Sequence, residues 1–173
     1  DPLLSRNGAD PVIHQGESSM IVAEAAGAFV RKVHEEGKPF FVCLWFGSPH
    51  GPYSGLREDV GLYGKVENEE QRHRFAEITA MDRAIGRFRT LLKELGLADN
   101  TLLWYSSDNG TPIPKSRDPH NGGFRGNKGS LYEGGLRVPA IVEWPAIIRR
   151  HRVSTVPCVS SDIFPTLLDL VGA

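Results

Sequence analysis

Residues 101–110 read TLLWYSSDNG, an apolar run that passes directly into polar residues and a turn former. The first six residues have no polar alternation, which predicts a buried strand. Asp108, Asn109 and Gly110 end that strand. Because open α/β sheets bind ligands at the carboxyl ends of their strands, this stretch predicts both a fold class and the place of a site.

Two further apolar runs repeat this pattern. Residues 39–46, PFFVCLWF, predict a central strand covered on both faces, and the polar sequence SPHGP follows it. Residues 140–144 form a third run, which Pro145 closes, and predict another strand.

Apolar residues at helical spacing separate these runs. Residues 18–36 predict one helix, which Gly37 ends. A second helix is predicted to begin at Asn68, whose spacing from Gln71 resembles a capping box, and to end at Gly96. Its face opposite the buried stripe is basic. The predicted buried stripe consists of Ile78, Met81, Ile85, Phe88, Leu92 and Leu95.

The order of these elements predicts an α/β protein. Helix, strand, helix, strand, loop, strand and a short final helix capped by Ser161 are typical of a mainly parallel sheet flanked by helices. Residues 54–66, rich in glycine and charge, are predicted to form a surface loop. No second domain boundary or internal repeat is visible, so a single domain is expected.

Composition excludes several classes of partner. The chain has 173 residues, of which 40% are hydrophobic and 24% charged, a balance typical of a soluble domain with one core. With a net charge of −1, no overall field favours nucleic acid or an anionic membrane. No apolar run approaches the roughly 20 residues that span a bilayer. Cys43 and Cys158 have no zinc-site spacing, and the opening DPLLSRNGAD indicates a piece cut from a longer chain.

Asp108 and Asn109 are the candidate metal ligands. A carboxylate beside an amide carbonyl suits a hard cation such as Ca²⁺ or Mg²⁺ rather than Zn²⁺. The alternative is an Asx turn after the strand, which the tripeptide taken alone favours.

Lys128 and His50 are the candidate catalytic residues. Lys128 lies among small residues in NKGSLYEGG, where its ammonium could approach an anion and stabilise a transferred oxyanion. His50 follows a proline at a strand end and could act as a general acid. The alternatives are a solvated loop lysine and a loop histidine bonded to the backbone.

Structural roles are predicted for the other notable polar groups. Glu133, Gly134, Gly135 and Arg137 indicate backbone geometry and an internal salt bridge that shape the turn bearing Lys128. Surface, cap or solvated-turn positions are expected for His14, His34, His73, His120, His151 and residues 149–152.

Four segments together resemble the type I sulfatases of the alkaline phosphatase-like superfamily. They read PFFVCLWFGSPHGP, MDRAIGRFRTLLKELGLADNTLLWYSSDNG, GNKGSLYEGGLRVPAIVEWP and VSSDIFPTLLDLVGA. They come in the family's order and spacing, and they cover most of the chain from Glu17 onward. The resemblance rests on the succession of four motifs rather than on any one of them.

The resemblance implies an alkaline phosphatase-like fold and sulfuric ester hydrolysis. It implies that Asp108 and Asn109 ligate a divalent cation, usually Ca²⁺, and that Lys128 and His50 contact the sulfate ester. In this family a cysteine or serine in C/S-x-P-S/A-R becomes formylglycine, whose hydrate attacks sulfur, while the histidine protonates the leaving oxygen. The implied partner is a sulfated small molecule or glycan, and the implied location is exported or lysosomal.

The formylglycine motif is absent from this chain. Cys43 is followed by LWF and Cys158 by VSS, so neither fits it. The family's first strand, its paired acidic ligands and its C-terminal subdomain are missing as well. Residues 1–173 are therefore interpreted as the C-terminal half of a sulfatase catalytic domain, a single incomplete domain expected to be inactive alone and to bind Ca²⁺ poorly.

Two other functions are compatible with these motifs. A phosphonate monoester hydrolase or phosphodiesterase of the same superfamily would use the same metal cleft, although KGSLYEGG followed by RVP favours a sulfatase. A non-catalytic relative that binds sulfated glycans is the third hypothesis, and the retained histidine, aspartate, asparagine and lysine argue against it. The sequence predicts neither the oligomeric state nor the substrate, because specificity in such folds lies in loops.

Overall fold

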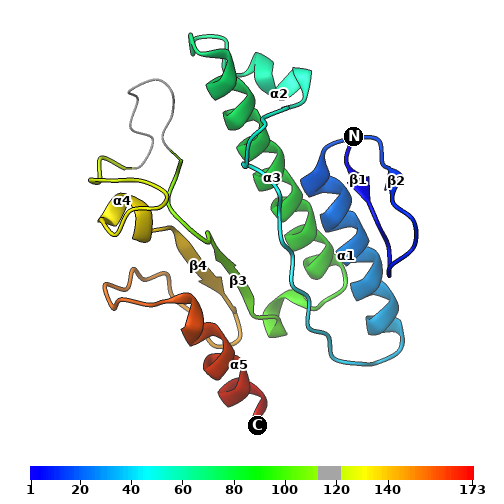
Figure 1. Ribbon diagram of the computed structural model, residues 1–173. Coiled ribbons are helices and arrows are strands. Elements are labelled where there is room, and N and C mark those ends of the chain that lie inside the picture. The colour runs from blue at the N-terminus through cyan, green and yellow to red at the C-terminus, as the bar shows by residue number, and fades with distance from the viewer. Residues whose placement is uncertain (113–121) are drawn as a thin grey trace. The chain divides into compact units, whose positions relative to one another are not determined.

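The computed structural model describes residues 1–112 and 122–173, which form two compact units (Figure 1). The first unit comprises Asp1–Asp99 and the second Asn100–Ala173. The expectation that the whole chain is one incomplete domain stays a prediction. His120, for which the sequence predicts no role in chemistry, lies outside the described residues. Among the described helices, none combines the length and apolarity needed to cross a membrane.

The first unit consists mainly of a helix pair, α1 (Ser18–Glu35) and α3 (Glu69–Glu94), which pack against each other (Figure 1). Both helices were predicted, and their bounds agree within two residues at each end. The predicted cap of α3 is confirmed, because the Asn68 side chain accepts a hydrogen bond of 2.9 Å from the Gln71 amide. A small antiparallel pair, β1 (Leu3–Leu4) and β2 (Val12–Ile13), precedes α1.

Small side chains dominate the buried surface of this helix pair. Met81 and Leu92 are buried as predicted, but Ile78 is 37% exposed. The buried residues of α1 and α3 instead include Ala23, Ala26, Gly27, Val30, Ala76, Ala80 and Ala84. Small residues allow two helix backbones to approach closely. A prediction based on the spacing of large apolar side chains does not count these small residues as buried.

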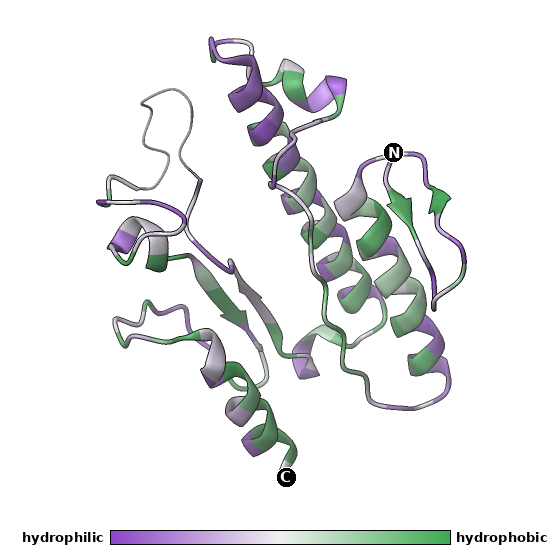
Figure 2. Cartoon of the chain, in the orientation of Figure 1, coloured by the Kyte–Doolittle hydropathy of each residue, from purple (hydrophilic) through white to green (hydrophobic). Residues whose placement is uncertain are grey.

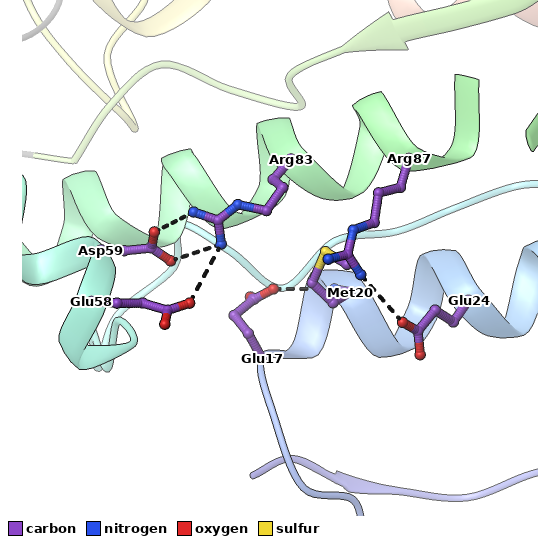
Figure 3. Close-up of polar contacts among 7 residues, drawn as sticks. All are labelled: Glu17, Met20, Glu24, Glu58, Asp59, Arg83 and Arg87. Atoms are coloured by element: carbon purple, nitrogen blue, oxygen red, sulfur yellow. Dashed lines mark hydrogen bonds and ion pairs between the residues drawn. The ribbon is translucent and has the colours of Figure 1, made fainter. Parts of the chain in front are cut away.

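The predicted surface loop at residues 54–66 contains a short helix, α2 (Arg57–Gly61). Asp59 in α2 is only 1% exposed, and both of its carboxylate oxygens accept hydrogen bonds from the Arg83 guanidinium of α3 (Figure 3). This ion pair raises the pKa of Arg83 above its ordinary value, because the guanidinium donates to a carboxylate. Arg83, one of the basic residues of α3 opposite its predicted buried stripe, therefore anchors α2.

The strand predicted at residues 39–46 is not formed. Among the described residues, no backbone hydrogen bond joins this segment to another, and a strand exists only where a partner completes its ladder. Its exposure nevertheless alternates, since Val42 and Leu44 are partly buried whereas Phe41 and Trp45 are exposed. The side chains thus have the two-residue period of an extended chain, without the hydrogen bonds of a sheet.

The second unit contains β3 (Leu103–Ser106) paired with β4 (Ala140–Glu143). Both strands were predicted, but the pairing is antiparallel, with Leu103 opposite Glu143 and Ser106 opposite Ala140. The prediction of a mainly parallel sheet is therefore wrong for the described residues, whose sheets are two antiparallel pairs. Parallel pairing needs a covering crossover and further strands, and the described part of the second unit contains only the β3–β4 pair.

The remaining elements of this unit are short helices. They are the 3₁₀ helix η1 (Ala98–Asn100), which includes the boundary between the two units, α4 (Glu133–Leu136), the 3₁₀ turn η2 (Ser160–Asp162) and α5 (Ile163–Val171). Ser161 does not cap α5 as predicted, because it lies within η2 and Asp162 takes the cap position. Strand β4 and helix α5 carry mostly hydrophobic residues (Figure 2), and Ile141, Phe164 and Val171 among them are exposed.

Candidate active site

Asp108 and Asn109 follow directly after β3, as the sequence predicts. The Ser107 amide continues the ladder by donating to the carbonyl oxygen of Pro139 at 3.3 Å, and the Ser107 hydroxyl donates to the Asn109 carbonyl oxygen at 3.0 Å. The Asn109 side-chain nitrogen donates to the Gly110 carbonyl oxygen at 3.0 Å. The amide oxygen of Asn109 and the exposed carboxylate of Asp108 are the groups left for a hard cation.

Gly110 joins this segment to a distant part of the chain. Its amide donates to the Gly135 carbonyl oxygen at 3.0 Å, and the residue is buried. A Cβ atom added at Gly110 would overlap the Gly134 carbonyl oxygen. Only glycine therefore permits this approach of the two backbones.

Lys128 lies at the tip of a tight turn formed by residues 127–130. The Ser130 amide donates to the Asn127 carbonyl oxygen at 2.9 Å, and Gly129 at the third position has φ of +86°. Positive φ at that position is typical of a type II turn and is most readily adopted by glycine. The Lys128 amide donates to the Thr111 carbonyl oxygen at 2.9 Å, whereas its side chain is exposed. The turn is thus fixed at its backbone and presents an ammonium that solvent can reach.

The predicted internal salt bridge is confirmed. Arg137 contacts the Glu133 carboxylate at 3.0 Å, and both side chains are more than 60% exposed, so the pair stabilises the fold only weakly. The buried backbone around it matters more, because the Gly134 amide donates to the Arg125 carbonyl oxygen at 2.8 Å. An added Cβ at Gly134 or Gly135 would overlap backbone oxygens.

His50 lies in the connection between α1 and α2, in the first unit. Its Nδ1 lies 2.8 Å from the Gly51 carbonyl oxygen, and its amide donates to the Gly47 carbonyl oxygen at 3.0 Å. Because a carbonyl only accepts, Nδ1 carries the hydrogen in this contact, and Nε2 is the ring atom available to a ligand. The backbone contact of the alternative interpretation is therefore present, and it fixes the orientation of the ring.

The structure joins the two segments that carry three of the four predicted site residues. Asp108, Asn109 and Lys128 lie in the second unit, where backbone hydrogen bonds connect their two segments. His50 lies in the first unit, so its convergence with them stays a prediction. Within the described residues, no group of three or more His, Cys, Asp or Glu side chains could hold a metal ion. The oxygen donors of Asp108 and Asn109 fit a hard cation in kind and would supply two ligands of its shell.

Sequence reasoning missed two buried carboxylates next to the His50 segment. Glu17 forms the N-cap of α1, and Glu77 lies on α3. A signal for each exists in the sequence: Glu17 immediately precedes a predicted helix, and Glu77 interrupts the apolar stretch from Phe75 to Met81. His73, expected at the surface or at a cap, accepts a hydrogen bond from the Gly55 amide.

Comparison with known proteins identifies the family. The family description "Sulfatase" matches residues 4–173. Human steryl-sulfatase is 37% identical over 174 residues, which cover 94% of this chain and 27% of that protein. The endo-4-O-sulfatase of Bacteroides thetaiotaomicron is 32% identical over 162 residues, which cover 81% of this chain and 30% of that protein.

The same relationship holds in three dimensions. The crystal structure of Ps i-CgsB in complex with k-i-k-neocarrahexaose matches 99% of this chain and 38% of its own chain, with a TM-score of 0.91 and 30% identity. The chain spans less than a third of each of the two curated relatives. Because the family match covers nearly all of the sequence, this chain belongs to the sulfatase family.

Proposed function

We propose that this chain is part of a sulfuric ester hydrolase and supplies one side of its sulfate and metal site. The observation that carries the proposal is the joining of residues 108–111 to residues 127–135. Two backbone hydrogen bonds, from Gly110 to Gly135 and from Lys128 to Thr111, hold the turn that bears Lys128 against the segment that bears the two proposed oxygen ligands. An anion held beside a divalent cation needs this combination of charges.

Each residue has a distinct role in this proposal. The Asp108 carboxylate and the Asn109 amide oxygen hold a divalent cation, Ca²⁺ or Mg²⁺, which when bound orients sulfate oxygens and offsets their charge. The Lys128 ammonium contacts the sulfate group and stabilises the negative charge that develops during transfer. With both ring nitrogens protonated, His50 donates the Nε2 proton to the leaving alkoxide or phenoxide oxygen and keeps the Nδ1 hydrogen bond to the Gly51 carbonyl oxygen. The nucleophile, formylglycine in this family, comes from outside the chain.

The substrate class is a sulfated small molecule or a sulfated glycan. Relatives with both kinds of name match the chain, among them steryl-sulfatase of mouse, 35% identical, and N-acetylgalactosamine-6-sulfatase of dog, 30% identical. Similarity at this level supports the reaction class.

The proposal is tested with the full-length protein that contains this chain. Hydrolysis of an aryl sulfate is compared with hydrolysis of the matched aryl phosphonate, with and without Ca²⁺. Faster sulfate hydrolysis that Asp108→Ala abolishes supports the proposal. Preferential phosphonate hydrolysis would indicate the related phosphonate hydrolases. Sulfated-glycan binding without turnover would indicate a non-catalytic relative, and either outcome overturns the proposal.

A further inference from the structure

The segment that carries His50 is held by side chains that no catalytic role explains. This segment, residues 48–54, lies between the extended residues 39–46 and helix α2. A serine at each end of this segment donates a hydrogen bond to a buried carboxylate. The Ser48 hydroxyl donates to Glu17, and the Ser54 amide donates to Glu77.

Glu17 connects the start of α1 to the beginning of this segment. Its Oε2 accepts the Met20 amide at 3.1 Å, which caps the helix (Figure 3). Its Oε1 accepts the hydroxyls of Ser18 at 3.2 Å and Ser19 at 3.0 Å. The same oxygen accepts the Ser48 hydroxyl at 3.2 Å, from 31 residues away in the sequence. Glu17 is 7% exposed, so these hydrogen bonds replace water around a buried charge.

Glu77 holds the other end of the segment. Its Oε1 accepts the Ser54 amide at 2.6 Å, and its buried Oε2 accepts no hydrogen bond from the described residues. Burial raises the pKa of Glu77, and the nearby Glu17 carboxylate adds to this effect, while the Ser54 amide and His73 oppose it. One turn earlier in α3, the His73 ring accepts the Gly55 amide at 3.2 Å, which continues the attachment.

Helix stability alone does not account for this arrangement. An aspartate or serine can cap a helix at the surface without burying a longer carboxylate. The Glu17 carboxylate opposes ionisation of the buried Glu77 carboxyl, and this lowers stability at neutral pH. What the two carboxylates have in common is that each fixes one end of the segment that carries His50.

We propose that Glu17 and Glu77 are positioning residues for His50: through Ser48 and Ser54 they fix the two ends of its segment and thereby the place of its imidazole. This inference rests on the proposed role of His50 as the general acid. Because Ser48 and Ser54 are only two and four residues from His50, a shift at either end displaces the ring directly. A displacement of about 1 Å at a reacting group can lower the rate about a hundredfold.

The test uses Ser48→Ala in the full-length protein, with Ser18→Ala as the matched control. Both substitutions remove a serine hydroxyl that donates to the same Glu17 oxygen, and only Ser48 belongs to the His50 segment. Steady-state rates are measured on an alkyl sulfate, whose leaving group needs protonation, and on a nitrophenyl sulfate, whose leaving group departs without it. We expect Ser48→Ala to lower kcat about tenfold to a hundredfold on the alkyl sulfate and much less on the aryl sulfate. Ser18→Ala should change both rates little.

Equal losses on the two substrates, or equal effects of the two variants, would overturn the positioning role while leaving the proposed function intact. Absence of sulfatase activity in the wild-type protein would instead contradict the proposed function. Amide hydrogen exchange then tests the attachment alone. Glu77→Ala should speed exchange of the Ser54 amide at least tenfold relative to Glu77→Gln, which retains an acceptor oxygen. Equal exchange in the two variants would show that Glu77 does not hold the segment.

Discussion

The backbone amide of Lys128 donates a hydrogen bond of 2.9 Å to the carbonyl oxygen of Thr111. Thr111 is three residues beyond Asp108, so this bond fixes the turn that bears the Lys128 ammonium beside the segment that bears the proposed metal ligands. The interaction uses only the backbone of Lys128. Its side chain can therefore be replaced without removing the connection.

Lys128→Ala in the full-length protein should lower turnover of a sulfate ester about a hundredfold, because one electrostatic contact to the reacting anion is lost. The midpoint of thermal unfolding should stay unchanged, because the side chain is exposed and the backbone bond remains. Arg150→Ala is the control, since Arg150 is an exposed cation in a predicted solvated turn. Unchanged turnover with Lys128→Ala would show that Lys128 is a solvated loop lysine with no role in the reaction.

Gly110→Ala should damage the same site through its backbone. The added methyl group would overlap the Gly134 carbonyl oxygen, and backbone cannot move aside as a side chain can. We expect a loss of about 1–3 kcal/mol in the free energy of unfolding, together with lower turnover. Gly86→Ala is the control, because a Cβ at that position in α3 would meet nothing within 4 Å. It should stabilise the helix by about 0.5–1 kcal/mol. Chemical denaturation of both variants decides between these outcomes, and a neutral Gly110→Ala would contradict the close backbone approach.

Local features of the fold could be predicted from the sequence. Caps, glycine stops and helical periodicity act between neighbouring residues, and the cap of α3 at Asn68 and the strands at residues 103–106 and 140–143 were predicted for that reason. The salt bridge between Glu133 and Arg137, one helical turn apart, is equally local.

Pairing between distant segments could not be predicted in the same way. An apolar run such as residues 39–46 indicates an extended, buried segment, but its hydrogen bonds depend on which other strand lies beside it. The direction of the β3–β4 pair depends on the path of the chain between the two strands. The carboxylate of Glu17 was missed because its partner Ser48 lies 31 residues away, a contact with no sequence period.

The 173-residue chain alone should bind Ca²⁺ only weakly and should not hydrolyse aryl sulfates. Calcium takes six to eight oxygen ligands in typical protein sites, and Asp108 and Asn109 supply two. The described residues hold no cluster of three or more His, Cys, Asp or Glu that could complete the shell. Calorimetric titration with Ca²⁺ and an aryl sulfate assay measure both properties. Micromolar affinity that disappears in Asp108→Ala would show that the chain contains a complete site.

Glu77 should make the stability of the protein fall as the pH rises. Its side chain is 7% exposed, and burial raises its pKa above the ordinary value of 4.5, with a further contribution from Glu17. The folded state therefore binds the Glu77 proton more tightly than the unfolded state does. The resulting stabilisation is fully present below about pH 4.5, the unfolded value, and is lost as the pH rises through the pKa of the folded state.

Glu77→Gln isolates this effect, because glutamine cannot ionise and still offers an oxygen to the Ser54 amide. Glu17 and His73, which act electrostatically on Glu77, are present in both proteins, so the comparison isolates the Glu77 carboxyl group. The free energy of unfolding of the variant minus that of the wild type should increase between pH 4.5 and pH 7, because only the wild type loses the stabilisation from the Glu77 proton. Urea unfolding at four or five pH values gives this difference directly. Parallel pH profiles for the wild type and Glu77→Gln would mean that the carboxyl group of Glu77 has the same pKa in the folded and unfolded chains, and that its burial carries no electrostatic cost.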